Sequence, residues 1–260
     1  KHGIEVTFFC RNLKGNLNSI IISNGFNLKI FEKKFQDQRL NPYKEWSKKE
    51  QIRDAHFLNK YSYKFNYIFS DHYGLAYSWE KHISFDGKLI VLDDFINKNH
   101  FCDYYINFHT KKISLLQKRI KKRNCKFLLG KKYLIIEKKN NKESFAYYKD
   151  KKKILIYFGT SDTKKITLRV TKTIIKNNYN NLNFLILVGQ NNKDVNQIKR
   201  IIKRNKNITL IKNIINFNKI YKTIKFTIGT HGQNFFERIF NSIPSIVILH
   251  NRLIKIDQRD

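Results

Sequence analysis

The stretch ILIYFGTSD, residues 154 to 162, is an apolar run that ends in a glycine turn and an acidic residue. From Thr163 to Asn178, apolar residues then recur at helical spacing, which predicts a helix with one buried face. A short apolar strand, a tight turn and an amphipathic helix in this order are typical of a parallel βα unit. The stretch therefore predicts an α/β protein.

The same alternation extends along the chain in both directions. The segment from Glu137 to Lys153, dense in Lys and Asn and without apolar periodicity, separates two halves. The expected strands are Ile4 to Cys10, Leu28 to Phe31, Tyr67 to Ser70, Leu89 to Leu92, Tyr104 to Asn107, Ile154 to Phe158, Phe184 to Val188, Thr209 to Ile211, Phe226 to Ile228 and Ser245 to Leu249. We expect two doubly wound, Rossmann-like domains that face a cleft (GT-B type), residues 1–140 and 141–260, with ligands beyond the carboxyl ends of the strands.

Two glycine turns follow strands in the second half. The first, Gly159-Thr160-Ser161-Asp162, leads into a helix, so backbone N–H groups and the positive end of a helix dipole make it a candidate anion site. The alternative is an ordinary turn in which Ser161 or Asp162 caps the helix. The second turn, from Gly229 to Gly232, leads to Glu237. By itself, Glu237 is equally explained as a solvated residue of the first helical turn.

The formal net charge of +32 over 260 residues would ordinarily suggest a polyanionic partner. Here Lys is scattered along the whole chain and accompanied by abundant Asn and Ile, few Gly and no Met. That joint bias is what an AT-rich genome produces, and no nucleic-acid-binding signature is present. We therefore expect no nucleic-acid partner, although a functional basic surface is the alternative.

The cysteine pattern and the apolar runs indicate the cellular compartment and whether a structural metal or a membrane helix is expected. Cys10, Cys102 and Cys125 are far apart, odd in number and without C-x-x-C spacing, which predicts a reducing compartment and no structural metal. His100 and Cys102 lack two further ligands at zinc spacing. No run has the length of a membrane helix, and no signal-peptide pattern stands at the start. We expect a cytoplasmic monomer without cofactor, metal or membrane partner.

Several blocks of the first half carry a resemblance to a known family. They are Asp71-His72-Tyr73-Gly74, Asp93-Asp94, His100-Phe101-Cys102-Asp103 with Asn107, and Leu128-Leu129-Gly130-Lys131-Lys132-Tyr133. Together with the turn at Gly159, the chain from about Val6 to Leu249 resembles the UDP-2,4-diacetamido-2,4,6-trideoxy-β-L-altropyranose hydrolases of pseudaminic acid biosynthesis. That family is built like two-domain nucleotide-sugar glycosyltransferases, so the resemblance implies the same fold.

The resemblance also implies roles for individual residues. Tyr73 matches the family tyrosine that lines the sugar pocket, although an aromatic cap on the core is the alternative. Glu237 matches the carboxylate that accepts hydrogen bonds from both ribose hydroxyls, and Asn251 matches an active-site Asn. Asp93 and Asp94 resemble a pair that supports acid–base work, or they cap helices. The expected substrate-binding residues are Arg11, Asn16, Gly159, Thr160, Ser161, Asp162, Gly232 and Glu237.

The start of the chain departs from the family. Family members begin with a strand, a G-x-G-H-x-x-R loop whose His is the expected general base, and a helix. Lys1 to Val6 instead matches the end of that helix and the second strand, so the first domain is incomplete. We expect the sequence to be a fragment that lacks this loop, and a decayed copy is the alternative.

The function implied is hydrolysis of a UDP-linked 2,4-diacetamido-2,4,6-trideoxy-L-altrose. Water would attack C1 with inversion and UDP would leave, and no metal is needed because UDP is a good leaving group. Three alternatives stay open: a nucleotide-sugar glycosyltransferase of the same build, a non-catalytic UDP-sugar-binding remnant, and a basic nucleic-acid-binding protein. Fold alone does not separate the first two from the hydrolase.

Overall fold

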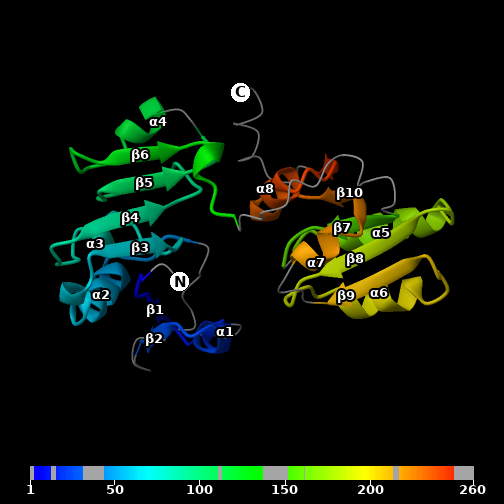
Figure 1. The fold of residues 1–260 in the computed structure, drawn as a ribbon, viewed down its shortest axis with the longest axis horizontal. Helices are drawn as coiled ribbons and strands as arrows, with labels where there is room; N and C mark the ends of the chain where they lie inside the picture. Colours follow the sequence, from blue (N-terminus) through cyan, green and yellow to red (C-terminus); the bar gives the residue numbers. More distant parts are fainter. Residues whose placement is uncertain are drawn as a thin grey trace. The chain divides into compact units, whose positions relative to one another are not determined.

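The chain divides into two compact units, Lys1–Leu134 and Ile135–Asp260 (Figure 1). A computed structural model describes residues 3–12, 16–31, 44–110, 113–136, 152–160, 162–212 and 217–248. The boundary expected between residues 140 and 141 falls in the segment 137–151, which lies outside the described residues. Each unit is an α/β body with parallel strands, as the sequence predicted.

The C-terminal unit is built on one five-stranded parallel sheet in the order β11-β10-β7-β8-β9. Its strands are β7 (Lys153–Tyr157), β8 (Asn183–Val188), β9 (Ile208–Lys212), β10 (Ile224–Gly229) and β11 (Ser245–Val247). Its helices are α5 (Ile166–Lys176), α6 (Val195–Ile202), α7 (Phe217–Tyr221) and α8 (Gln233–Phe240). All five strands expected in this half are present, and β10 begins before the expected Phe226.

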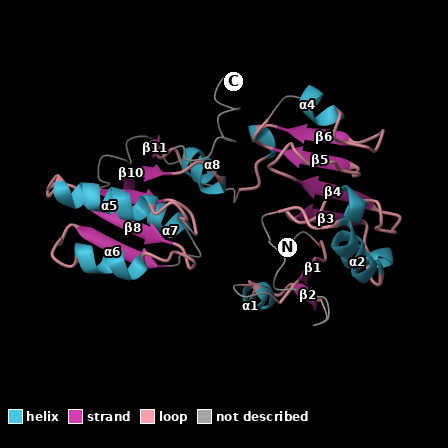
Figure 2. Ribbon diagram, turned by 180° about the vertical axis from the view of Figure 1, so that it is seen from behind, coloured by secondary structure: helices cyan, strands magenta, loops and turns pink. Residues whose placement is uncertain are grey.

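Both faces of this sheet are buried, which is why its central strands are continuously apolar. In β7, Ile154 and Ile156 join the core under α5 and α6, whereas Leu155 joins a second core with Ile220 and Tyr221 of α7. Successive side chains of a strand point to opposite faces, so one apolar run supplies both cores. Figure 1 shows α7 over one face of the sheet, and Figure 2, from behind, shows α5 and α6 over the other.

The N-terminal unit has a four-stranded parallel sheet, β3-β4-β5-β6, and a separate parallel pair, β1-β2. The strands are β1 (Thr7–Cys10), β2 (Asn27–Ile30), β3 (Tyr67–Asp71), β4 (Lys88–Leu92), β5 (Tyr104–Asn107) and β6 (Lys126–Leu129). The helices are α1 (Asn18–Ser23), α2 (Lys48–Asn59), α3 (Tyr77–Glu80) and α4 (Ile113–Gln117), with 3₁₀ turns at Ser62–Lys64 and Lys131–Tyr133. The sequence prediction found β1 to β5 and missed β6, which it had noted only as a motif.

The core of the N-terminal unit lies between α2 and one face of the four-stranded sheet. Ala55 and Leu58 of α2 pack with Ile68 of β3 and with Leu89 and Val91 of β4. The pair β1-β2 joins this core through Phe9, and several of its own apolar side chains stay exposed, including Phe8 (37%) and Ile30 (42%). No helix in the described segments is long and apolar enough to span a membrane.

Candidate functional site

Three neighbouring strand ends of the N-terminal unit bring polar side chains together. Asp71 ends β3, Asp94 follows the end of β4 by two residues, and His109 follows the end of β5 by two residues. Tyr73 Oη donates a 2.8 Å hydrogen bond to Asp94 Oδ2, and His109 Nε2 lies 3.3 Å from Asp94 Oδ1. The expected catalytic residue Tyr73 therefore belongs to a Tyr73–Asp94–His109 cluster at the carboxyl edge of the sheet, where ligands of such sheets bind.

A buried amide fixes the geometry of this cluster. Asn107, the last residue of β5, donates from Nδ2 to the Asp93 carbonyl at 2.8 Å. Its Oδ1 accepts from the backbone N–H groups of His109 at 2.9 Å and Thr110 at 3.2 Å. Because Asn107 is 1% exposed, this amide has little freedom to rearrange. It holds the turn that carries His109 against the segment that carries Asp94.

The pKa values of two carboxylates in and beside the cluster are shifted in opposite directions. Burial raises the pKa of Asp94, but the nearby His109 and the hydrogen bond from Tyr73 outweigh it and lower the pKa overall. Burial and the charges of Asp94 and Asp93 raise the pKa of Asp71, an effect that water screens because Asp71 is exposed. Burial and the Asp94 carboxylate both raise the pKa of Tyr73, so its phenol stays protonated. Neighbouring acids with opposite shifts are a common feature of acid–base sites.

Behind the cluster lies a second, fully buried set of charges. His100 Nδ1 lies 2.6 Å from Glu80 Oε1, and its Nε2 lies 3.1 Å from Asp93 Oδ2. Lys98 Nζ lies 3.4 Å from Asp93 Oδ1. This set fixes Asp93 directly beside Asp94. Among the described residues no group of three or more His, Cys, Asp or Glu side chains is arranged to hold a metal ion.

Two expected substrate-binding residues of the N-terminal unit have partners within the protein. Arg11 Nη2 lies 2.8 Å from Asp54 Oδ2, and its guanidinium stacks over Trp46 with 4.5 Å to the ring centroid. Both side chains of this ion pair are 7% exposed. Asn16 accepts from the backbone N–H of Asn18 at 3.1 Å, at the start of α1. Their roles in binding substrate stay predictions.

In the C-terminal unit, the turn after β7 is closed by its own acidic residue. Asp162 Oδ1 accepts from the Ile166 N–H at 2.9 Å, and Oδ2 accepts from the Thr167 N–H at 2.7 Å. The carboxylate thus caps α5, as the capping alternative had it, and occupies two of the N–H groups that an anion would use. Gly159 has a φ of 90°, and Thr160 follows it in the turn. Ser161 lies outside the described residues.

The second glycine turn, after β10, is held by a buried arginine. Arg238 Nη1 donates to Thr227 Oγ1 at 3.2 Å, and Nη2 donates to the Thr230 carbonyl at 2.7 Å. Gly232 has a φ of 151° and is the N-cap residue of α8, so the N-cap itself supplies no side-chain acceptor. The N-terminus of α8 is a candidate anion site, because backbone N–H groups and the positive end of a helix dipole lie there.

Glu237, one turn into α8, is held by two polar side chains. Its Oε2 accepts from Asn234 Nδ2 at 3.2 Å and from Tyr221 Oη at 3.5 Å. Burial raises its pKa, and the side chain is half-buried. The carboxylate is thus oriented beside the glycine turn, about five residues from Gly232. Asn251, the other expected catalytic residue, lies outside the described residues.

The sequence analysis gave no role to His109, Asn234, Tyr221 or Arg238. A signal for His109 existed, because it follows β5 closely and strand ends carry ligands in such sheets. Asn234 and Arg238 flank Glu237 on α8 and were visible only as its neighbours. Tyr221 comes from a different helix, so only the folded chain brings it to Glu237.

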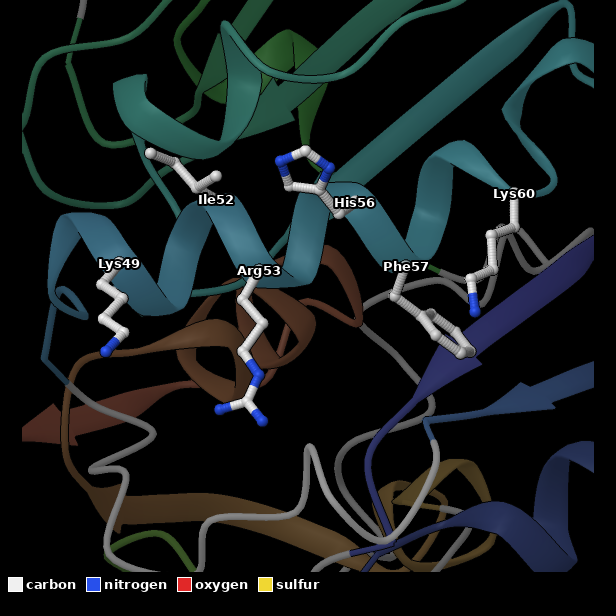
Figure 3. Close-up of a pocket in the computed structure, with 6 residues that line it drawn as sticks. All are labelled: Lys49, Ile52, Arg53, His56, Phe57 and Lys60. Carbon is white, nitrogen blue, oxygen red and sulfur yellow. The ribbon is translucent and has the colours of Figure 1, made fainter.

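An open groove of about 330 Å³ runs along α2 (Figure 3). It is lined by Lys49, Ile52, Arg53, His56, Phe57 and Lys60. Figure 3 shows these side chains on one helix, with no carboxylate among them. The groove has no acid–base pair, and no residue of the clusters described above belongs to it.

Sequence comparison and structure comparison give different answers for this chain. No protein-family model matches the sequence, and no curated protein matches it either. Solved structures do match. MnaA of S. aureus in complex with UDP aligns over 91% of this chain and 69% of its own length, with a TM-score of 0.56 and 13% identity.

Two further structures extend the similarity. MurG of Acinetobacter baumannii aligns over 98% of this chain and 73% of its own, with a TM-score of 0.55 and 11% identity. UDP-GlcNAc 2-epimerase of Neisseria meningitidis bound to UDP-GlcNAc aligns over 95% and 83%, with a TM-score of 0.52 and 14% identity. These matches establish the fold. The chain has the α/β, Rossmann-like architecture of the GT-B type, and at these identities they carry no activity with them.

Proposed function

We propose that this chain binds a UDP-linked sugar and hydrolyses it to UDP and the free sugar. The observation that carries the proposal is the start of α8, where a helix N-terminus with a glycine N-cap and the oriented Glu237 carboxylate follow a glycine turn. A helix N-terminus suits a diphosphate, and a carboxylate suits the two ribose hydroxyls. Two of the structures that share the fold were solved with UDP or UDP-GlcNAc bound, which supports a uridine nucleotide.

Within the C-terminal unit, Gly232 and Glu237 would hold UDP. Within the N-terminal unit, the Tyr73–Asp94–His109 cluster offers acid–base groups for the reaction. Water attacks C1, the bond from C1 to the β-phosphate oxygen breaks, and UDP leaves with inversion at C1. The motif resemblance around Asp71 to Gly74 supports 2,4-diacetamido-2,4,6-trideoxy-L-altrose as the sugar, and hence a step of pseudaminic acid biosynthesis.

A second candidate is epimerisation of the bound UDP-sugar, which the similarity to a UDP-GlcNAc 2-epimerase favours. A third is transfer of the sugar to an acceptor, which the same fold allows. These reactions differ in their products. Hydrolysis gives free sugar and UDP without an acceptor, transfer needs an acceptor, and epimerisation leaves the sugar attached to UDP.

The test combines UDP calorimetry with NMR of the products from UDP-2,4-diacetamido-2,4,6-trideoxy-L-altrose. We expect UDP to bind and free sugar to accumulate with inverted configuration at C1. Glu237→Gln should weaken UDP binding by about 10- to 100-fold, because a hydrogen bond to a charged group is worth about 1.5–3 kcal/mol. Lys199→Gln, which removes one charge from the exposed side of α6, is the matched control and should change nothing. Absence of UDP binding would overturn the proposal.

A further inference from the structure

We propose that Cys102 and Cys125 form a reversible oxidation site, at which a peroxide converts the two thiols into one disulfide. The proposed hydrolysis uses neither side chain, so this inference stands apart from it. Three features of the pair support it: the distance between the sulfur atoms, the strands that hold them and their unequal exposure.

The two thiols are already neighbours in the folded chain. Cys102 Sγ lies 3.8 Å from Cys125 Sγ, and both cysteines are free. A disulfide has a sulfur–sulfur distance of about 2.05 Å, so the two atoms have to approach each other by about 1.8 Å. Rotation about the two Cα–Cβ bonds moves the sulfur atoms over this range. Cys10, the third free cysteine, lies in β1, in the separate pair β1-β2.

Neighbouring strands hold the backbone of the pair in place. Cys125 directly precedes β6, and Cys102 lies two residues before the start of β5. These strands pair in parallel with Tyr104 opposite Lys126, and the Lys126 N–H donates to the Asp103 carbonyl at 2.8 Å. Neighbouring strands lie about 4.8 Å apart, within the Cα separations of about 4.4–6.8 Å that disulfides bridge. The bond can therefore form without displacing either strand.

The two cysteines differ in their access to solvent. Cys102 is 0% exposed and packs in the core with Tyr105 and Leu116. Cys125 is partly exposed and packs against the margin of the same core. A dissolved oxidant therefore reaches Cys125 first, and Cys102 reacts only with the sulfur beside it. An accessible thiol next to a resolving thiol is the usual arrangement of a redox-sensing cysteine pair.

The surroundings favour the thiolate on the exposed member of the pair. The hydrogen bond with Cys102 lowers the pKa of Cys125. Burial and the carboxylates of Asp103 and Glu80 act in the opposite direction and are outweighed. For Cys102, the same hydrogen bond and burial both raise the pKa, so its thiol keeps the proton. Because the thiolate is the nucleophile, Cys125 is the sulfur that a peroxide oxidises first.

A metal ion is the other common ligand of two close thiols. A structural zinc takes four ligands, and in the described segments no group of three or more His, Cys, Asp or Glu side chains is arranged to hold an ion. His100 lies close in sequence, but Glu80 and Asp93 face its two ring nitrogens. The pair therefore suits oxidation better than metal binding.

The reaction consumes one peroxide for each disulfide. The Cys125 thiolate attacks one peroxide oxygen, the O–O bond breaks and hydroxide leaves, which gives a sulfenic acid. The Cys102 sulfur then attacks the Cys125 sulfur, its proton joins the departing hydroxide, and the S–S bond forms. The two sulfur atoms lose two electrons, and the peroxide is reduced to water. A dissolved thiol reverses the reaction by thiol–disulfide exchange.

The test treats the reduced, folded chain with hydrogen peroxide, alkylates the remaining thiols and maps the disulfides by mass spectrometry. We expect a linked peptide pair that contains Cys102 and Cys125, an alkylated Cys10, and recovery of all three thiols after dithiothreitol. Cys10 is the matched control, because it is a partly exposed free cysteine of the same unit. Oxidation of Cys125 should be at least about 10-fold faster than that of Cys10. Absence of the linked pair, a disulfide that includes Cys10, or equal rates at Cys10 and Cys125 would overturn the inference.

Variants separate the roles of the two thiols. Cys102→Ser should leave a sulfenic acid on Cys125 that dimedone traps, because the resolving thiol is absent. Cys125→Ser should leave Cys102 reduced, because its sulfur is buried. Cys10→Ser should form the linked pair as the wild type does. Rapid oxidation of Cys102 in Cys125→Ser, or no dimedone adduct in Cys102→Ser, would contradict these roles. The wild-type mapping needs no substitution, so it decides the inference even where a variant fails to fold.

Discussion

Among single residues, two glycines at strand ends are packed too tightly to be replaced by any residue with a side chain. A Cβ on Gly189, which follows β8, would lie 2.2 Å from Thr160 Cα in the turn after β7. A Cβ on Gly229, at the end of β10, would lie 2.4 Å from Arg238 Nη1 and 2.5 Å from the Tyr157 carbonyl. Real Cβ atoms do not approach so closely, so both strand ends require glycine for packing. Gly229 was expected in a glycine turn, but only the fold shows the contacts that leave no room for a side chain at either glycine.

We predict that Gly229→Ala destabilises the protein by about 1–3 kcal/mol, because Arg238 or the strand must move to admit the methyl group. The displaced Arg238 would also loosen the turn that it holds through Thr230. Lys225→Ala, at an exposed position of the same strand, should stay within about 0.5 kcal/mol of the wild type. Urea unfolding monitored by circular dichroism measures both. Equal stability of the two variants would contradict the packing argument.

Among the elements, α5 depends on one residue for its start. Asp162 has a φ of 40° and accepts from the N–H groups of both Ile166 and Thr167. Lys165, the residue directly before the helix, makes no side-chain cap. The expected helix from Thr163 therefore begins later, at Ile166, because the cap lies four residues before it.

Asp162→Ala should cost about 0.5–2 kcal/mol, since two first-turn N–H groups lose their acceptor. Asp162→Asn should retain most of the stability, because Asn caps helices well and tolerates a positive φ. Chemical denaturation gives both values. A loss of stability in Asp162→Asn as large as that in Asp162→Ala would show that the charge and its interaction with the helix dipole matter more than the hydrogen bonds.

Buried His100, in the segment before β5, connects α3 and the end of β4 through its contacts with Glu80 and Asp93. Burial lowers the pKa of His100, but hydrogen bonds to Asp93 and Glu80 outweigh it and raise the pKa to about 9. The unfolded chain binds this proton with a pKa of about 6.5. The folded state therefore holds the proton more tightly, so the stabilisation is complete below about pH 6.5 and is lost as pH rises through about 9.

We expect the free energy of unfolding of the N-terminal unit to fall by on the order of 3 kcal/mol between pH 6.5 and pH 9. His100→Gln should remove most of this pH dependence and should destabilise the unit at pH 6, where it leaves buried carboxylates unpaired. His72, whose pKa burial lowers to about 4, acts in the opposite sense and only below about pH 6.5, outside this window. An unchanged slope in His100→Gln would refute the assignment.

For the whole molecule, the strands could be predicted because parallel strands buried on both faces leave continuous apolar runs. Leu155 and Ile156 pack into cores on opposite faces of the sheet. Both must therefore be apolar, and consecutive apolar residues are visible in the sequence. β6 was missed because its burial is only partial, so Lys126 to Leu129 carries a weaker signal. The chain divides after Leu134, and the boundary expected between residues 140 and 141 lies outside the described residues.

Tyr73, Asp94 and Glu237 were selected from the sequence through the motif resemblance, and the structure places the first two in contact. Their roles in binding or catalysis stay predictions. Pairings between distant segments were not predictable, because they depend on register. Asp94 meets His109 only because β4 and β5 are neighbours with Leu92 opposite Ile106. The ion pair between Arg11 and Asp54 of α2 was likewise not predictable from the sequence.

The division into two units determines how cooperatively the chain should unfold. Each unit has its own core, so we expect two unfolding transitions in guanidinium rather than one. Both tryptophans of the chain, Trp46 and Trp79, are buried in the N-terminal unit, so their fluorescence reports that unit alone. His100→Gln should move the fluorescence transition to lower denaturant, whereas Asp162→Ala should leave it in place.

Circular dichroism reports both units and should show the complementary pattern. In Asp162→Ala its transition should broaden or split while fluorescence is unchanged, and in the double variant the two effects should add within about 0.5 kcal/mol, as they do for distant sites. Coincident fluorescence and dichroism transitions in all four proteins would mean that the units unfold together. In that case the free energy coupling them would exceed the differences made by His100 and Asp162, and the units would have to be treated as one cooperative body.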